Sequence, residues 1–417
     1  MLIFFYRVIS YFFLIISPLI IIFRIFKKKE SIFRFLERYG FYSQPRKKGR
    51  LIWFHCSSVG ELLSVVPLIE RFESQKKINQ ILVTTTTLSS SKIFQKLKLK
   101  KTIHQFFPID NKLIIKKFIN YWKPEVFFLC ESEIWPNLIH FISKKKIKMI
   151  LINARMSLKS FNRWHLIKYS SKEIFKQFDL CFSQNKETLK RLKLLGVKNI
   201  YNIGNLKFAT RKRVRTEVLE KNTIDFFKSK RILVTAASTH FNEEDFVIKN
   251  HLYFKNKKNF KNAISIIVPR HAERSKEIKD EIEKYSLKAH LRSSGNKIDS
   301  DVDIYIADTY GELNKIYKIS NIVFMGGSLI DHGGQNPLEP AKLGCYIIHG
   351  PSTYNFKEIY NHLKSNNMSA VFKNYVEGTN ILNKLLFKKR LSNKNKKLLE
   401  YGKKILNLTY LEIAKFI

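Results

Sequence analysis

The sequence predicts an α/β protein with two doubly wound domains that face each other across a crevice, preceded by a membrane-anchor helix. Three observations lead to this fold class. Residues 1–26 are almost wholly apolar. From residue 51 onward, short apolar runs alternate with longer amphipathic stretches, which is typical of a parallel sheet wrapped by helices. The alternation stops at a charged stretch that begins at Arg211 and then starts again, so a second domain of the same kind is expected.

Residues 1–29 are predicted to form the anchor and its basic flank. About 22 apolar residues in a helix span roughly the 30 Å hydrocarbon core of a bilayer. No small-residue cleavage site precedes the charges, so a retained anchor is favoured over a signal peptide. Lys27–Lys29 follow directly, and the positive-inside rule then places the rest of the chain in the cytoplasm. Residues 31–50 mix aromatic and basic side chains, as a segment lying against an anionic leaflet would.

Residues 30–210 are predicted to form the first domain. Its expected strands are the runs LIWFHC, ILVTTT, VFFLC, MILINA, LCFSQ and IYNIG. Residues 211–417 are predicted to form the second domain, in which a charged linker and lead-in precede the runs RILVTAAS, ISIIVPR, DIYIAD, NIVFMGG and YIIHG. Ligands of doubly wound sheets bind outside the carboxyl ends of the strands. The segments that follow these runs are therefore the candidates for a site.

The charge of the chain is extreme, with 76 Lys and Arg against 34 Asp and Glu and a formal net charge of +42. Most of the lysines are scattered among Ile, Asn and Phe, which indicates a compositional background on solvated faces. No arginine-rich arm, zinc-finger spacing or ribonucleoprotein signature appears, so nucleic acid is not the expected partner. An anionic membrane surface or a phosphorylated substrate is expected instead. The four cysteines form no CxxC pair, which fits a reducing, cytoplasmic setting.

Three acidic turns share one spacing: Ser58–Glu61 (SVGE), Thr309–Glu312 (TYGE) and Asn336–Glu339 (NPLE). In each turn the first side chain can cap a helix by bonding the N3 amide while the glutamate reaches back, with Pro337 at the first helical position of the third. All three turns follow predicted strands and would converge on the crevice. Each glutamate therefore has a structural interpretation, helix capping, and a chemical one, and the two are compatible.

Glycines concentrate in the segment Gly326–Gly344, around Asp331 and His332. Glycine lets a backbone approach a ligand closely, and a helix that opens at Asn336 would point unpaired amides at an anion. A nucleotide would suit this segment. The pattern is neither GxGxxG nor a Walker loop, which argues against dinucleotide redox chemistry and ATP hydrolysis.

The string VPRHAER places Arg270, His271 and Arg274 just after a predicted strand. Two guanidinium groups and an imidazole at a strand end suit a nucleotide phosphate, although isolated surface arginines are an equal alternative. The histidines of the chain show no spacing of the HExxH kind, so neither a metal nor another cofactor is expected.

Together these motifs resemble those of one family, the Kdo transferases of lipopolysaccharide synthesis, which move 3-deoxy-D-manno-octulosonic acid (Kdo) from CMP-Kdo to a lipid A precursor. The matching strings, in chain order, are SVGE, ESEIWPNLI, NARMS, GNLKF, AASTH, PRHAER, DTYGEL, GGSLIDHGGQNPLEPA and GPSTYNF. They extend over residues 50–360. Ser90, Leu158 and Ala209 depart from the family pattern, and none of them is a predicted catalytic position.

The resemblance implies a GT-B-type glycosyltransferase of two Rossmann-like domains facing across a cleft, with the acceptor bound mainly by the first and the nucleotide by the second. It implies that Glu61 is the general base and that Glu131 and Lys207 support the transition state. It also implies nucleotide contacts from Pro269, Arg270, Tyr310, Gly311, Glu312, Asn336, Pro337, Leu338 and Glu339. The implied partners are CMP-Kdo, the lipid A precursor (lipid IVA) and the membrane surface, on the cytoplasmic side of the bacterial inner membrane.

The expected chemistry agrees with the motifs, because attack by a sugar hydroxyl needs one base while the departing CMP phosphate needs positive charge and backbone N–H groups. Two alternatives remain open. One is another two-domain transferase, or an epimerase, that uses a UDP-sugar. The other, from a different class, is a non-catalytic membrane-tethered basic protein that binds anionic lipid or nucleic acid.

Overall fold

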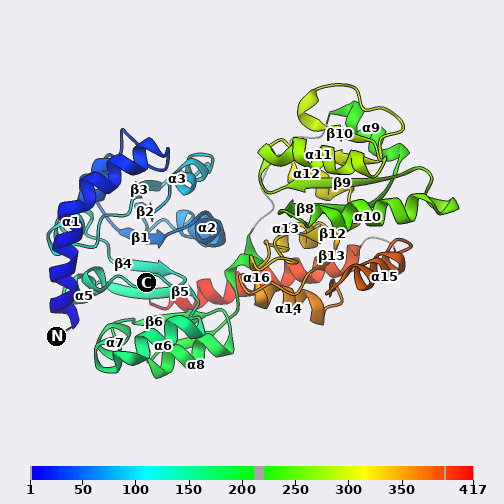
Figure 1. Cartoon of the computed structure of the whole chain (residues 1–417). Coiled ribbons are helices and arrows are strands. Elements are labelled where there is room, and N and C mark those ends of the chain that lie inside the picture. Colours follow the sequence, from blue (N-terminus) through cyan, green and yellow to red (C-terminus); the bar gives the residue numbers. More distant parts are fainter. Residues whose placement is uncertain (1, 211–219, 389–390, 417) are drawn as a thin grey trace. The chain divides into compact units, whose positions relative to one another are not determined.

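The structure is a computed structural model that describes residues 2–210, 220–388 and 391–416 (Figure 1). The chain divides into two compact units, which we call unit 1 (residues 1–210 and 401–417) and unit 2 (residues 211–400). Each unit contains one parallel sheet of seven strands with helices between the strands. The predicted fold class, two doubly wound α/β halves, is confirmed. The first nine residues of the predicted linker lie outside the described residues.

The sheet of unit 1 has the strand order β3-β2-β1-β4-β5-β6-β7. Its central strands are buried along their whole length, which is why they read as continuous apolar runs in the sequence. Trp53 on β1 lies in the core and packs against Phe107, Phe118 and Phe127. The strands are β1 (Leu51–Cys56), β2 (Gln80–Thr85), β3 (Thr102–Phe106), β4 (Val126–Cys130), β5 (Lys148–Ala154), β6 (Leu180–Ser183) and β7 (Ile200–Asn202).

The helices of unit 1 present one apolar face to this sheet. Helix α4, for example, buries Ile115, Phe118 and Trp122 while its lysines stay outside. The helices are α1 (Leu2–Phe26), η1 (Phe35–Tyr39), α2 (Val59–Glu73), α3 (Leu88–Gln95), α4 (Lys112–Trp122), α5 (Pro136–Lys144), α6 (Leu158–Leu166), α7 (Lys168–Phe175), α8 (Lys186–Leu194) and η2 (Leu206–Ala209).

The sheet of unit 2 has the strand order β10-β11-β9-β8-β12-β13-β14. The strands are β8 (Arg231–Thr239), β9 (Ala263–Pro269), β10 (Ala289–Leu291), β11 (Ile304–Ile306), β12 (Ile322–Met325), β13 (Tyr346–His349) and β14 (Ser369–Val371). The helices are α9 (Lys221–Ser229), α10 (Glu244–Lys255), η3 (Lys258–Phe260), η4 (Ala272–Arg274), α11 (Ser275–Lys284), η5 (Arg292–Ser294), α12 (Leu313–Ile319), α13 (Leu338–Lys342), α14 (Lys357–Ser365), α15 (Tyr375–Leu385) and α16 (Ser392–Ala414).

The apolar runs do not predict strands β3, β10 and β14, which all lie at the edges of their sheets. In β3 the reason is visible, because two polar side chains interrupt the run. His104 Nε2 bonds Thr85 Oγ1 at 2.8 Å, and Gln105 Nε2 donates to the carbonyl of Phe41 at 2.8 Å. Because His104 and Gln105 are polar and have hydrogen-bond partners inside the protein, the hydrophobicity pattern of the sequence does not reveal β3.

Two segments differ from the predicted domain organisation. The residues of α16 from Tyr401 onward belong to unit 1, whereas the sequence assigns everything from residue 211 to 417 to the second domain. Packing explains this, because the Tyr401 ring meets Phe208 edge-on at 5.1 Å. A Cβ on Gly402 would lie 2.1 Å from the Phe208 carbonyl, so only glycine permits this close approach. In addition, the later part of the predicted linker forms helix α9.

Helix α1 contains the one segment, among the described residues, that is long and apolar enough to cross a membrane, Phe4–Phe26, with a mean hydropathy of 2.4. The helix does not stand apart from the fold. It belongs to unit 1 and packs beside α5 (dark blue in Figure 1). The Tyr6 hydroxyl donates to Asp110 at 2.9 Å, and the hydroxyls of Ser17 and Tyr39 lie 2.9 Å apart. The predicted division between an anchor and a separate first domain is therefore not seen.

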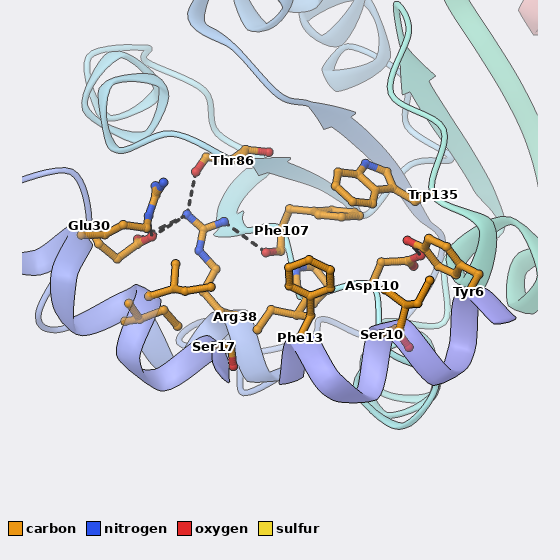
Figure 2. A pocket seen from close by; sticks show the side chains of 16 residues that line it. Tyr6, Ser10, Phe13, Ser17, Glu30, Arg38, Thr86, Phe107, Asp110 and Trp135 are labelled. Carbon is orange, nitrogen blue, oxygen red and sulfur yellow. Dashed lines mark hydrogen bonds and ion pairs between the residues drawn. The ribbon is translucent and has the colours of Figure 1, made fainter. Parts of the chain in front are cut away.

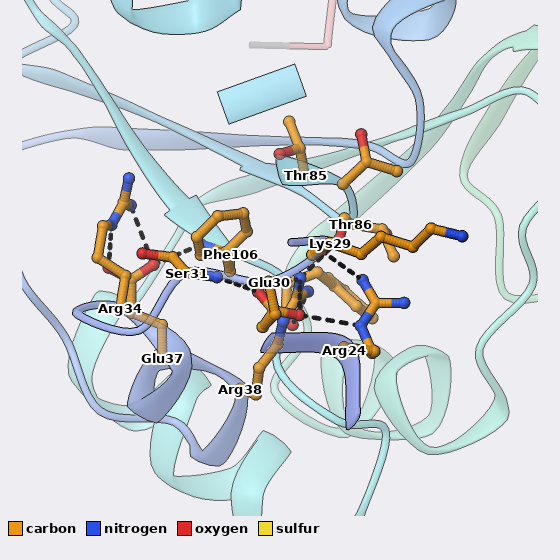
Figure 3. Close-up of polar contacts among 12 residues, drawn as sticks. Arg24, Lys29, Glu30, Ser31, Arg34, Glu37, Arg38, Thr85, Thr86 and Phe106 are labelled. Atoms are coloured by element: carbon orange, nitrogen blue, oxygen red, sulfur yellow. Dashed lines mark hydrogen bonds and ion pairs between the residues drawn. The ribbon is translucent and has the colours of Figure 1, made fainter. Parts of the chain in front are cut away.

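Hydrogen bonds tie the basic segment after α1 to the strands of unit 1, because the Arg38 guanidinium donates to the Thr86 carbonyl at 2.6 Å and Glu37 accepts the Phe106 N–H at 2.6 Å. Ion pairs within the segment hold these side chains in place (Figure 3). Arg34 bonds Glu37 at 2.7 Å, and Arg38 bonds Glu30 at 3.1 Å. Arg38 is only 7% exposed. Arg38 is therefore occupied within the protein, whereas 22% of the Arg34 side chain remains exposed. The expectation that residues 31–50 lie against an anionic leaflet stays a prediction.

Candidate active site

Helix α2 begins at the carboxyl end of β1, and its first turn holds Glu61. Ser58 is the N-cap residue, and its Oγ accepts the N–H of Glu61 at 3.3 Å. The carboxylate reaches back, because Oε2 accepts the N–H of Ser57 at 2.8 Å and Oε1 accepts the Ser58 hydroxyl at 3.1 Å. The predicted capping arrangement is confirmed for this turn. The Glu61 side chain is half-buried.

The pKa of Glu61 is raised from 4.5 to about 7. Burial is the largest cause, and the charge of Glu131 is the second, while hydrogen bonds from Ser57 and Ser58 act in the opposite direction. Among the described residues, no lysine, arginine or histidine forms an ion pair with Glu61. A carboxylate with a pKa near neutrality is suited to accept a proton.

Glu131 follows β4 and forms an ion pair with Lys207. Its φ of 60° lies in the left-handed region that residues other than glycine rarely adopt. The Lys207 Nζ lies 2.7 Å from Glu131 Oε1, and the two side chains are 16% and 8% exposed. Asn205 caps η2 and accepts the N–H of Lys207 at 2.9 Å, which holds the lysine at this position. Two of the predicted catalytic residues are thus brought together from distant parts of the sequence.

Asn153 connects the two segments that carry Glu131 and Lys207. The sequence does not predict it as a site residue. Asn153 is the last residue but one of β5 and has a φ of 52°. Its Nδ2 donates to Glu131 Oε1 at 3.3 Å, and its Oδ1 accepts the N–H of Leu206 at 2.9 Å. Asn153 lies within the NARMS string, but nothing in local spacing connects it to Glu131.

A second carboxylate next to Glu131, that of Glu133, extends the site. Its Oε2 lies 3.8 Å from Nε2 of the buried His55 and accepts the Trp135 indole N–H at 3.2 Å. Burial alone would raise the pKa of Glu133, but its interactions with His55, Ser57 and Trp135 outweigh burial and lower it. Burial lowers the pKa of His55, so the imidazole is neutral at pH 7. We call Glu61, Glu131 and Glu133 the carboxylate cluster.

In unit 2, the segments predicted to bind a nucleotide follow neighbouring strands. Strands β11, β9, β8 and β12 lie side by side in the sheet and run parallel. Pro269 ends β9 and Arg270 follows it, residues 310–312 come after β11, and residues 336–339 come after β12. Because carboxyl ends of parallel strands share one edge, these segments lie at one edge of the sheet, which we call the unit 2 edge.

The predicted capping arrangement is wrong for Thr309–Glu312. Helix α12 starts only at Leu313, and Glu312 itself occupies the N-cap position without capping through its side chain. Its carboxylate accepts the Thr309 hydroxyl at 2.5 Å and pairs with Arg292 at 3.3 Å and Lys315 at 3.6 Å. Burial would raise the pKa of Glu312, but the hydroxyl and the guanidinium outweigh it and lower the pKa.

The turn Asn336–Glu339 is shifted by one residue from the prediction. Pro337 occupies the N-cap position rather than the first helical position, and Leu338 begins α13. Asn336 still contributes, because its Oδ1 accepts the N–H of Leu338 at 3.1 Å. The ring of Pro337 fixes the backbone φ of that residue, and the regular helix begins only at the next residue, Leu338.

The glycine-rich segment after β12 is organised by Glu243, a residue that the sequence patterns do not single out. This fully buried carboxylate accepts four backbone N–H groups: those of His240 at 3.0 Å, Gly327 at 2.6 Å, Ser328 at 3.0 Å and Leu329 at 3.0 Å. Three of these donors lie more than 80 residues further along the chain, so no local motif could reveal the contact.

The arginines of the VPRHAER string have different surroundings. Arg274 forms an ion pair with Glu244 at 3.0 Å, and its side chain is only 20% exposed. Arg270 is exposed at the unit 2 edge, where its N–H bonds the carbonyl of Thr239 at 3.0 Å. Arg270 is therefore better placed than Arg274 to meet an anion.

Three histidines gather at the unit 2 edge. The His240 ring lies 4.3 Å from that of His332 and 6.2 Å from that of His271, measured between ring centroids. Burial, followed by the charge of His332, lowers the pKa of His240. In the part of the chain that the structure describes, no three His, Cys, Asp or Glu side chains are grouped so that they could hold a metal ion.

Comparison with known proteins identifies the family. The profile of the 3-deoxy-D-manno-octulosonic-acid transferase (kdotransferase) family matches residues 33–210. The 3-deoxy-D-manno-octulosonic acid transferase of Haemophilus influenzae is 34% identical over 337 residues, which cover 79% of this chain and 78% of that protein. The chain belongs to the Kdo transferase family. The transferase of the same name from Rickettsia bellii is 34% identical over 419 residues, which cover 99% of each chain.

Family membership confirms the predicted resemblance and makes the protein a glycosyltransferase rather than a non-catalytic basic protein. Among solved structures, a UDP-N-acetylglucosamine 2-epimerase superposes with a TM-score of 0.60 at 12% identity, covering 89% of this chain and 96% of that one. This likeness shows the GT-B-like fold alone. It gives no support to a UDP-sugar donor, because fold does not determine substrate.

Proposed function

We propose that this protein transfers Kdo from CMP-Kdo to the lipid A precursor (lipid IVA) by a single displacement with inversion at the anomeric carbon. The observation that carries the proposal is the half-buried Glu61 carboxylate at the end of β1, whose pKa is raised to about 7. Such a group is ionised in a useful fraction near neutral pH and binds a proton readily. Family membership supports the substrate class.

In the proposed step, a hydroxyl of the acceptor sugar gives its proton to Glu61 while its oxygen bonds to the anomeric carbon of Kdo. The bond between that carbon and the phosphate oxygen of CMP breaks, and its electron pair leaves with CMP. The negative charge of Glu131 helps the proton transfer because it raises the pKa of Glu61. Glu61 then releases the proton to water before the next turnover.

Glu131 and Lys207 have a supporting role in the proposal. The Kdo carboxylate and the departing phosphate are both anionic, so a fixed cation stabilises the transition state. Lys207 can act as that cation because Glu131 holds its Nζ at 2.7 Å and Asn205 fixes its backbone. Little reorganisation is then needed when negative charge shifts to the leaving group.

The nucleotide is proposed to bind at the unit 2 edge, and the acceptor mainly at unit 1. The Glu312 carboxylate is kept ionised by Thr309 and Arg292, so it can accept hydrogen bonds from ribose hydroxyls. Arg270 and the backbone amides near α13 would meet the phosphate. The other proposed nucleotide contacts at this edge are Pro269, Tyr310, Gly311, Asn336, Pro337, Leu338 and Glu339.

Helix α1 is proposed to attach the enzyme to the inner membrane, with both units on the cytoplasmic side. Its exposed apolar side chains and the exposed Lys27–Lys29 that follow support this location. The acceptor is itself a membrane lipid, so attachment places the carboxylate cluster near its substrate.

The direct test is to incubate the purified full-length protein with CMP-Kdo and tetraacylated lipid A precursor and to weigh the lipid product by mass spectrometry. The proposal predicts a mass increase of one or more Kdo residues that depends on CMP-Kdo. UDP-sugars should give no product. Transfer from a UDP-sugar, or no transfer from CMP-Kdo to any lipid acceptor, would contradict the proposal.

A further inference from the structure

A cavity of about 420 Å³ lies between α1 and the strand ends of unit 1 (Figure 2). Its volume is within the range of roughly 300–1,000 Å³ that is usual for small-molecule sites. Helix α1 forms one wall with Ile9, Phe13 and Ile20, and the opposite wall carries Phe107 and Trp135. The cavity is therefore lined mainly by aliphatic and aromatic side chains.

The charged groups that border the cavity already have partners inside unit 1. Arg38 reaches the floor, where its guanidinium bonds Glu30 at 3.1 Å and the carbonyls of Thr86 and Phe107 at 2.6 and 3.2 Å (dashed lines in Figure 2). Asp110 accepts the Tyr6 hydroxyl at 2.9 Å. Because Arg38 is paired with Glu30 and Asp110 is satisfied by hydrogen bonds from Tyr6, Asn137 and Leu138, the cavity favours an apolar occupant over an anion.

Helix α1 has two different faces. Towards the cavity it is fixed by polar contacts, among them the hydroxyl pair of Ser17 and Tyr39 at 2.9 Å. The rim residues Ile9 and Phe13 are 52% and 56% exposed. The opposite face is apolar and lies open, with exposed fractions of 62% for Phe12, 77% for Ile15, 69% for Leu19 and 63% for Phe23. An apolar helix face of this kind lies in lipid, so acyl chains can reach the rim of the cavity.

The inner end of the cavity adjoins the carboxylate cluster. The Phe107 ring stacks on His55 with centroids 3.9 Å apart, and the Trp135 indole donates to Glu133 at 3.2 Å. The same two aromatic side chains line the cavity. These two rings therefore lie next to both the cavity and the carboxylate cluster, so an apolar tail in the cavity and a polar head at the cluster would be close together.

We propose that this cavity binds one acyl chain of the acceptor lipid, an inference that rests on the function proposed above. The lipid would enter from the exposed face of α1, place one chain against Phe13, Ile20 and Phe107, and thereby bring its sugar hydroxyl to the carboxylate cluster. Helix α1 is then part of the acceptor site as well as a membrane attachment.

The test compares two tryptophan substitutions on neighbouring residues of α1. Ile20→Trp fills the cavity, whereas Leu19→Trp makes a similar change on the open face, because Leu19 does not line the cavity. For Ile20→Trp, we expect KM for the tetraacylated acceptor to rise about tenfold, the factor expected when burial of about two methylene groups is lost. KM for CMP-Kdo and turnover of a deacylated, water-soluble acceptor should not change. Leu19→Trp should behave like the wild type in each assay.

A photolabelling experiment detects an acyl chain in the cavity whether or not Kdo transfer occurs. An acceptor lipid with a diazirine at the end of one acyl chain should label residues 107–110 of the wild type, and Ile20→Trp should reduce this labelling while Leu19→Trp does not. Equal kinetics and equal labelling for the two variants would overturn the acyl-chain site. If the wild type transfers no Kdo but residues 107–110 are labelled, the proposed function fails while the lipid site stands. Labelling at residues 107–110 by a diazirine phospholipid at the same level as by the acceptor would also overturn the proposed specificity.

Discussion

Two turns with nearly the same sequence, SVGE at Glu61 and TYGE at Glu312, hold their carboxylates in opposite electrostatic states. Glu61 sits in the first turn of α2, where burial and the charge of Glu131 raise its pKa to about 7. Glu312 precedes α12, where Thr309 and Arg292 lower its pKa despite burial. The sequence pattern is thus shared, but the two glutamates occupy different positions relative to their helices and have different neighbours, and these differences decide the chemistry.

The difference matches the two roles proposed here. A general base must change its protonation state near the working pH, so a half-buried carboxylate that has no ion-pair partner among the described residues suits it. A carboxylate that binds hydroxyl groups must stay ionised, so a guanidinium at 3.3 Å suits it. Substitutions of these residues test whether the two carboxylates have these different roles.

The largest effect is expected for Glu61→Gln. Glutamine can keep the contacts to Ser57 and Ser58 but cannot accept the proton, so kcat should fall by about 10²- to 10⁴-fold. Steady-state kinetics with the tetraacylated acceptor measures this loss, and circular dichroism checks that the variant is folded. Near-normal turnover of a folded Glu61→Gln protein would remove the base assignment.

Lys207→Met should have the next largest effect. It removes the proposed fixed cation and leaves the Glu131 carboxylate, 8% exposed, without its 2.7 Å partner. Loss of one such electrostatic contact lowers kcat by roughly 10²- to 10³-fold in other enzymes. Lys207→Arg is the matched control, because it retains the charge and should recover part of the activity. Equal activity of the Met and Arg variants would show that the charge has no role.

Glu312→Gln should act on donor binding rather than on the proton transfer. KM for CMP-Kdo should rise by about tenfold, the usual consequence of losing a hydrogen bond to a charged group. The pH dependence of kcat should stay that of the wild type, because Glu61 is unchanged. A shift of the pH profile by Glu312→Gln, with no change in KM for the donor, would reverse the roles assigned to the two carboxylates.

The smallest predicted effect is on stability. The folded protein raises the pKa of Glu61 from 4.5 to about 7, so folding favours the protonated form. The free energy of unfolding of the wild type should therefore fall, relative to that of Glu61→Gln, as pH rises through this window, by about 1 kcal/mol after allowance for solvent screening. Urea titrations followed by tryptophan fluorescence can detect this, because all tryptophans lie in unit 1: Trp53, Trp122, Trp135 and Trp164. A difference that is constant with pH would mean that the pKa of Glu61 is not raised.

The sequence predicts the fold well where strands are buried on both faces. The runs of β1 and β4 are continuous and apolar because helices cover both sides of the sheet. The edge strand β3 escapes prediction because His104 and Gln105 are buried with polar partners that no local pattern reveals. The placement of α16 on unit 1 depends on one close approach at Gly402, which is equally invisible in the sequence.

The candidate site, like the fold, has local features that the sequence predicts and long-range contacts that it does not. The capping contacts of Glu61 are local, and the sequence predicts them. Only the family resemblance implies that Glu131 and Lys207 belong to the site, because their ion pair joins distant segments of the sequence. Glu243 was missed entirely, since the amides that it binds follow β12 while Glu243 itself precedes α10. Local sequence spacing therefore does not predict the parts of the site that depend on contacts between distant segments.

The most direct test of the central claim is the pH dependence of kcat/KM for the acceptor, measured with the wild type at saturating CMP-Kdo. If Glu61 is the base, kcat/KM should rise with pH and level off above an apparent pKa of about 7. Glu131→Gln removes the second cause of the raised pKa, so in that variant the midpoint should move to lower pH. A wild-type profile that is flat through neutrality, or a midpoint that Glu131→Gln leaves in place, would contradict the account.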